Sequence, residues 1–120
     1  MAEDLLRKVE IDWLLSIYGA MLTDKQREMA TLYYEEDYSL AEIAQQEGVS
    51  RQSVHDTLQR VEKQLRTWEE KLNMRKRLTN VQTQLEQALN AVESGNCAKA
   101  KPAIETALNL LTDEEDENGL

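Results

Sequence analysis

The sequence predicts an all-α protein, and three of its features lead to that prediction. Its 120 residues include four glycines and one proline, too few turn residues for a many-stranded β fold. Hydrophobic residues make up 41% of the chain and phenylalanine is absent, so we expect a core of aliphatic side chains between helices. Apolar residues also recur at helical spacing along much of the chain.

Residues 4–18 are predicted to form the first helix, and Gly19 is its predicted end. Apolar residues at helical spacing form its predicted inner face: Leu6, Val9, Trp13 and Ile17. Trp13 is predicted to anchor the core, because nothing else in this segment supports a role in stacking on a ligand.

A second helix is predicted to begin at Thr23, because Thr23 and Gln26 match a capping box and Asp24 suits the positive end of a helix. Its predicted inner face is Met29, Leu32 and Tyr33. The tyrosine-rich segment 33–38, YYEEDY, is predicted to end this helix. Its tyrosines would pack at the rim of the core, or would form a protein-binding surface flanked by acids.

Residues 39–65 have the pattern of a helix, a tight turn and a second helix. Ser39 and Glu42 match a second capping box, Gly48 suits a position of positive φ, and Ser50 can cap the next helix. The predicted inner positions are Ile43, Ala44, Val54, Leu58, Val61 and Leu65. This is the helix-turn-helix pattern, whose second helix is offered to a nucleic-acid groove, although the same core also serves protein contacts.

The second motif helix is predicted to continue to about residue 77, because Trp68 and Leu72 extend its apolar stripe at heptad-like spacing. The basic residues at its predicted end are Arg75, Lys76 and Arg77. These residues would complement the negative end of the helix dipole, or would form a patch that binds phosphate.

Residues 79–93 and 98–111 are predicted to form a helical hairpin that packs through small residues and turns at residues 94–96. Its predicted inner positions are Val81, Leu85, Ala88, Leu89, Val92, Ile104, Ala107, Leu108 and Leu111. Pro102 is expected either to begin the second helix or to kink it. The predicted domains are a helix-turn-helix domain (1–77), the hairpin (78–111) and an acidic disordered tail (112–120).

The net charge of −9 is unevenly distributed. Residues 51–80 carry eight basic and four acidic groups, whereas the segments before and after them are acidic. The overall field therefore opposes the approach of nucleic acid. The basic block can still bind phosphate locally, with an affinity that falls steeply as salt rises.

Nothing in the sequence points to catalysis, and no cofactor or metal is expected. One cysteine and one histidine cannot form an intramolecular disulfide or a metal site, and we find no Gly-rich phosphate loop or nucleophile elbow. The N-terminal segment is charged, unlike a signal peptide, and the longest uncharged run, residues 13–23, is too short to span a bilayer. We therefore expect a cytoplasmic protein that is not an enzyme and has no membrane span.

The candidate nucleic-acid-binding residues occupy the outer positions of the second motif helix: Arg51, Gln52, Ser53, His55, Gln59 and Arg60. Arginine can read guanine and glutamine can read adenine in a major groove. Residues 39–66, however, carry four basic and four acidic groups, whereas a typical groove reader adds several phosphate-neutralising groups. His55, beside Asp56, is either a solvated surface residue or a contact to a base or phosphate.

Residues 21–74 closely resemble the YlxM family of helix-turn-helix proteins, and the stretches LTDKQ, LYYEEDYSLAEIA and VSRQSVHD carry the resemblance. Residues 22–54 also look like the fourth region of bacterial sigma factors, which reads promoter DNA. The resemblance implies an all-α fold like that region. It also implies a bacterial cytosolic protein of the signal recognition particle pathway, a link that rests on gene neighbourhood.

Three functions follow, in order of preference. The first is an accessory or regulatory protein of the signal recognition particle pathway that contacts its RNA or its GTPases. The alternative is a DNA-binding transcription regulator that reads the major groove with helix 51–60, and a purely structural interaction module ranks below both. Because the hairpin and the long helix both present apolar faces, a homodimer is also predicted, with folding of the hairpin onto its own chain as the alternative.

Overall fold

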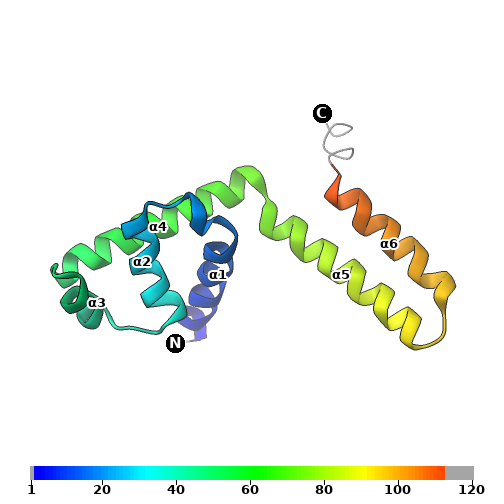
Figure 1. Ribbon diagram of the computed structural model, residues 1–120, viewed down its shortest axis with the longest axis horizontal. Helices are drawn as coiled ribbons and strands as arrows, with labels where there is room; N and C mark the ends of the chain where they lie inside the picture. The colour runs from blue at the N-terminus through cyan, green and yellow to red at the C-terminus, as the bar shows by residue number, and fades with distance from the viewer. Residues whose placement is uncertain (1, 113–120) are drawn as a thin grey trace. The chain divides into compact units, whose positions relative to one another are not determined.

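The computed structural model describes residues 2–112, and within that range the chain is helical and contains no strand (Figure 1). The predicted all-α class is therefore confirmed. Contacts divide the chain into two compact units, Met1–Asn73 and Met74–Leu120. The acidic tail predicted for residues 112–120 lies outside the described residues except for Thr112.

The first unit holds the helix-turn-helix, which is preceded by two α-helices (Figure 1). Its elements are α1 (Ala2–Tyr18), the 3-10 turn η1 (Gly19–Met21), α2 (Asp24–Ala30), the π-helical turn η2 (Thr31–Glu35), α3 (Leu40–Glu47) and α4 (Arg51–Leu72). Helices α1, α2 and α3 all pack against α4, so α4 is the central element of this unit.

The local signals that begin and end the motif helices are confirmed. A reciprocal capping box joins Thr23 and Gln26 at the start of α2, and a second one joins Ser39 and Glu42 at the start of α3. Gly48 ends α3 with a φ of 69°, in the left-handed region that disfavours residues with a Cβ. The hydroxyl of Ser50 then accepts a hydrogen bond from the first turn of α4.

The core of this unit lies between α4 and the three helices around it. Its buried residues are Ile11, Leu14, Leu15, Tyr18, Leu22, Met29, Ala30, Ile43, Ala44, Val54, Leu58, Val61 and Leu65. The inner positions predicted for both motif helices are therefore confirmed, because all six are buried. Leu32 and Tyr33 of the second helix are only half buried.

The face predicted for α1 was wrong. Leu6, Val9 and Trp13 are 69%, 60% and 37% exposed, whereas the buried stripe begins at Ile11. The two stripes share the helical period but lie on different sides of α1. Packing against α4 buries the second stripe and leaves Trp13 at the surface, so Trp13 is not a core anchor.

The long helix also ends earlier than predicted. α4 stops at Leu72, because Asn73 adopts a left-handed conformation with a φ of 57°, and α5 (Met74–Glu93) begins immediately after it. The basic residues 75–77 therefore occupy the first turn of α5 and not the end of α4. Cations at the start of a helix oppose its dipole, so the dipole-complementing role predicted for them is wrong.

The second unit is a hairpin of α5 and α6 (Cys97–Leu111), and the chain turns at Gly95, which has a φ of 78° (Figure 1). Small residues fill the seam, as predicted: Ala88, Ala100 and Ala103 are buried together, and Ala91 packs against them. Pro102 lies inside α6 and does not begin it.

The larger apolar residues of the hairpin do not lie in the seam. Of the predicted inner positions, Val81, Ala88 and Ala107 are buried, and the others are 43–58% exposed: Leu85, Leu89, Val92, Ile104, Leu108 and Leu111. Alanine at the seam lets two helices approach closely, and the leucines beside it are left on the surface.

Candidate nucleic-acid interface

The outer face of α4 carries the predicted binding residues. All six, from Arg51 to Arg60, are exposed, whereas Val54 and Leu58 on the inner side of the same helix are buried. The three helices packed against α4 hold it by that inner side. The helix therefore presents a fixed polar surface, as a helix that enters a groove must do.

Asp56 lies among the predicted residues and is tied to two of them. The amide nitrogen of Gln52 donates a hydrogen bond of 2.9 Å to its carboxylate, and Nδ1 of His55 lies 3.7 Å from the same carboxylate. A base that hydrogen-bonds to Gln52 must compete with Asp56. The negative charge of this carboxylate also repels a phosphate at this point. Close contact between this surface and the backbone of a duplex is therefore disfavoured.

The carboxylate of Glu62 is engaged on the side of α4 that faces α1. Arg7 donates two hydrogen bonds to it, and Arg66 pairs with both Glu62 and Glu10. Burial favours a raised pKa for Glu62, but the hydrogen bonds and charges of Arg7 and Arg66 outweigh burial and hold that pKa below its ordinary value. Tyr34 also donates a long hydrogen bond of 3.5 Å to Glu62, and burial raises the pKa of its hydroxyl.

Several cations on α4 remain available to a ligand, and three of them lie within residues 51–63, near the predicted residues. Across residues 2–112, neither Arg51, Arg60 nor Lys63 forms an ion pair with a carboxylate. Lys63 was not among the predicted residues, although its spacing of three from Arg60 places both on adjacent positions of the helix surface. The sequence could not show that Glu62, next to Lys63, already has two arginine partners.

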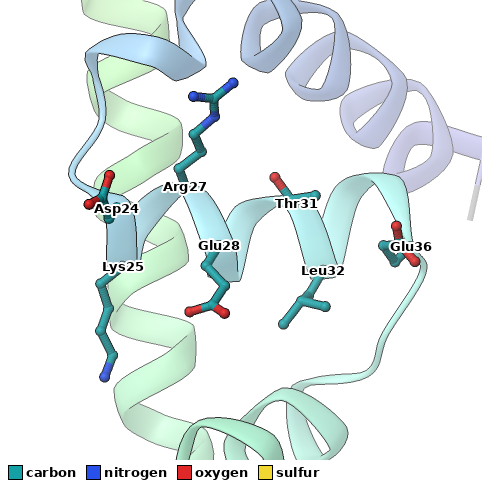
Figure 2. A pocket seen from close by; sticks show the side chains of 7 residues that line it. All are labelled: Asp24, Lys25, Arg27, Glu28, Thr31, Leu32 and Glu36. Carbon is teal, nitrogen blue, oxygen red and sulfur yellow. The ribbon is translucent and has the colours of Figure 1, made fainter.

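A groove of about 660 Å³ runs along α2 and η2 (Figure 2). Its lining residues are Asp24, Lys25, Arg27, Glu28, Thr31, Leu32 and Glu36. Arg27 and Thr31 point to one side of the continuous helix of α2 and η2, and Glu28 and Leu32 point to the other (Figure 2). Three carboxylates against two cations make this surface unsuitable for phosphate, so size alone does not identify the nucleic-acid site.

Two features are absent from residues 2–112. No cluster of three or more His, Cys, Asp or Glu side chains there could hold a metal ion. None of the helices between residues 2 and 112 is both long and apolar enough to cross a bilayer.

These caps, this turn and this exposed helix define a helix-turn-helix protein. The chain belongs to the UPF0122 family, described as "Putative helix-turn-helix protein, YlxM / p13 like", whose model matches residues 5–116. The UPF0122 protein of Desulforamulus reducens is 37% identical over 102 residues, which cover 85% of this chain and 87% of that one.

Other UPF0122 proteins match a shorter part of the chain. The protein of Clostridium botulinum is 49% identical over 67 residues, which cover 56% of this chain and 62% of that one, less than two thirds of its length. That of Thermoanaerobacter sp. is 46% identical over 80 residues, which cover 67% of this chain and 68% of that one. The predicted family is therefore confirmed, whereas the likeness to the fourth region of sigma factors stays a prediction.

Proposed function

We propose that this chain is a cytoplasmic accessory or regulatory protein of the bacterial signal recognition particle pathway, and that it binds the RNA of that particle through the outer face of α4. The exposed surface of α4 supports this proposal most directly. It offers Arg51 and Arg60 without competing carboxylate partners among the described residues, and its inner side is fixed by packing. The basic residues 75–77, at the start of the second unit, stay a separate candidate for phosphate binding.

RNA is favoured over duplex DNA because the cations on α4 are few and Asp56 stands among them. Groove reading of a duplex requires many phosphate contacts along the backbone. Structured RNA offers unstacked bases and loops, which a few cations and amides can bind. The alternative, a transcription regulator that reads DNA with helix 51–60, is supported by Arg51 and Gln52 in the first turn of α4.

A pulldown from bacterial lysate, made with and without nuclease, separates these possibilities. The proposal expects the tagged protein to recover the signal recognition particle RNA, and expects RNase but not DNase to abolish that recovery. Recovery of DNA alone would favour the transcription regulator. Capture of the pathway's GTPases after nuclease treatment would mean that the chain contacts protein. Recovery of none of the three, the RNA, the DNA or the GTPases, would contradict the proposal.

We also propose that the hairpin pairs with the hairpin of a second copy. Four exposed residues each lie four positions after a buried residue of the seam. These exposed residues are Leu85, Val92, Ile104 and Leu111. Because α5 and α6 are antiparallel (Figure 1), this equal offset places both exposed stripes on one side of the hairpin. A second identical face fits that surface by two-fold symmetry, and the resulting four-helix arrangement would cover six half-exposed apolar side chains.

A further inference from the structure

A smaller groove lies between α2 and the middle of α4, with a volume of about 300 Å³. It is lined by Gln26, Arg60, Lys63, Gln64, Thr67 and Trp68. None of these described lining residues is acidic, in contrast to the larger groove along α2. The two cations therefore face a space without an adjoining carboxylate in its wall.

This groove carries positive charge because the ion pairs of α4 lie on another flank of the helix. Glu62 is held by Arg7 and Arg66 on the flank that faces α1. Residues two apart on a helix do not face each other, so Arg60 lies on a different flank from Glu62. Within residues 2–112 no carboxylate pairs with Arg60 or Lys63, and both side chains are exposed.

The other walls of the groove suit a flat ring. Trp68 is half buried and lines the groove. The centroid of its ring lies 6.3 Å from that of the Tyr18 ring. Gln26 is held in place because its side-chain oxygen accepts a hydrogen bond from the backbone of Thr23, which leaves its amide N–H groups as donors. An indole, an oriented amide and two cations together match a base that carries a phosphate.

We infer that this groove binds one nucleotide, with its base against Trp68 and its phosphate between Arg60 and Lys63. The same nucleotide chemistry can come from a free nucleoside monophosphate or from an unstacked residue of a single strand. A base inside a duplex cannot reach Trp68, so the site would select unpaired nucleic acid. The inference deepens the proposed RNA binding and shares Arg60 with it, but it does not use Arg51 or Gln52.

Trp68 fluorescence in a Trp13→Phe background tests the inference, because the chain has only these two tryptophans. The probes are AMP, a 5′-phosphorylated single-stranded oligoadenylate, a DNA duplex, adenosine and inorganic phosphate. We expect AMP or the single strand to quench Trp68, and adenosine, phosphate and the duplex to do so much less. Quenching by AMP would identify a free nucleotide as sufficient, whereas quenching by the single strand alone would identify a strand as the source.

Lys63→Ala should weaken that binding by roughly five- to tenfold, and Lys25→Ala on α2 removes the same charge as a matched control. Both side chains are exposed, so circular dichroism should show an unchanged fold. Equal weakening by Lys25→Ala, or no quenching by AMP or the single strand, would overturn the groove as a site. RNA binding that depends on Arg51 but does not quench Trp68 fluorescence would overturn this inference and would not affect the proposed function.

Discussion

Arg7 on α1 and Glu62 on α4 form a two-point contact that joins the first helix to the helix offered to a ligand. Nε and Nη2 of Arg7 donate hydrogen bonds of 2.9 and 2.7 Å to the two carboxylate oxygens of Glu62. The side chain of Glu62 is only 14% exposed, so solvent screens this pair less than an ordinary surface pair. The pair fixes the flank of α4 that faces α1.

Glu62→Gln should lower the free energy of unfolding by about 1–2 kcal/mol at neutral pH, because it removes the charge that Arg7 and Arg66 share. The folded-state pKa of Glu62 lies below its ordinary value of 4.5, so its contribution is complete above pH 4.5 and is lost as the pH falls through the lower folded pKa. Urea unfolding at neutral and acidic pH measures both effects. Glu70→Gln, at an exposed position of α4, is the control, and an equal loss in both variants would contradict the role of the pair.

Alanine substitutions on α1 distinguish its buried stripe from its exposed one. Leu14→Ala should cost about 2–4 kcal/mol, because Leu14 is 2% exposed and its removal leaves a cavity. Val9→Ala should stay within about 0.5 kcal/mol, because Val9 lies on the surface. Thermal unfolding of both variants measures the difference, and the reverse order would mean that the other stripe packs against α4.

Gly48→Val should cost at least about 1 kcal/mol, because a β-branched residue resists the left-handed conformation that Gly48 adopts. A Cβ at this position would meet no atom within 4 Å, so the cost comes from the backbone and not from crowding. Gly48→Asn should be milder, since asparagine tolerates positive φ. An unchanged melting temperature in the valine variant would rule out this account of the turn.

The oligomeric state tests the apolar face of the hairpin. Light scattering at micromolar concentration should give the mass of a dimer, and the double variant Leu89→Glu, Leu108→Glu should give the mass of a monomer. Both residues are more than half exposed, so charge there should not disturb the seam. The double variant Leu5→Glu, Leu6→Glu places the same charge on exposed leucines of α1 and should leave the dimer intact. A monomer mass for the unaltered chain would refute the dimer.

Local chemistry made the motif predictable from the sequence. Ser39 and Glu42 satisfy each other's hydrogen bonds within one turn, and Gly48 supplies the conformation that ends α3. The exposed positions of α4, such as Arg51, could be deduced from the helical spacing of Val54 and Leu58, because that spacing marks the buried side of the helix. None of these features depends on residues far away in the sequence.

The features that were missed depend on packing between distant segments. Periodicity could not decide between the stripes that contain Val9 and Leu14, because only contact with α4 selects one of them. Both Ala88 and Leu89 were predicted to lie in the hairpin seam, but close approach of the helices buries Ala88 alone of the two. The end of α4 differs, because asparagine tolerates positive φ and Asn73 was a local signal, which the apolar stripe up to Leu72 obscured.

Fluorescence anisotropy with labelled signal recognition particle RNA tests the central claim most directly. A DNA duplex of equal length serves as competitor, and the titrations are made at two salt concentrations. The account predicts that the RNA binds more tightly than the duplex, and that Arg51→Ala weakens RNA binding by roughly 1–3 kcal/mol. Lys99→Ala, at an exposed position of α6, should have little effect. Equal affinity of the Arg51→Ala variant and the unaltered chain, or tighter binding of the duplex, would contradict the claim that the outer face of α4 binds this RNA.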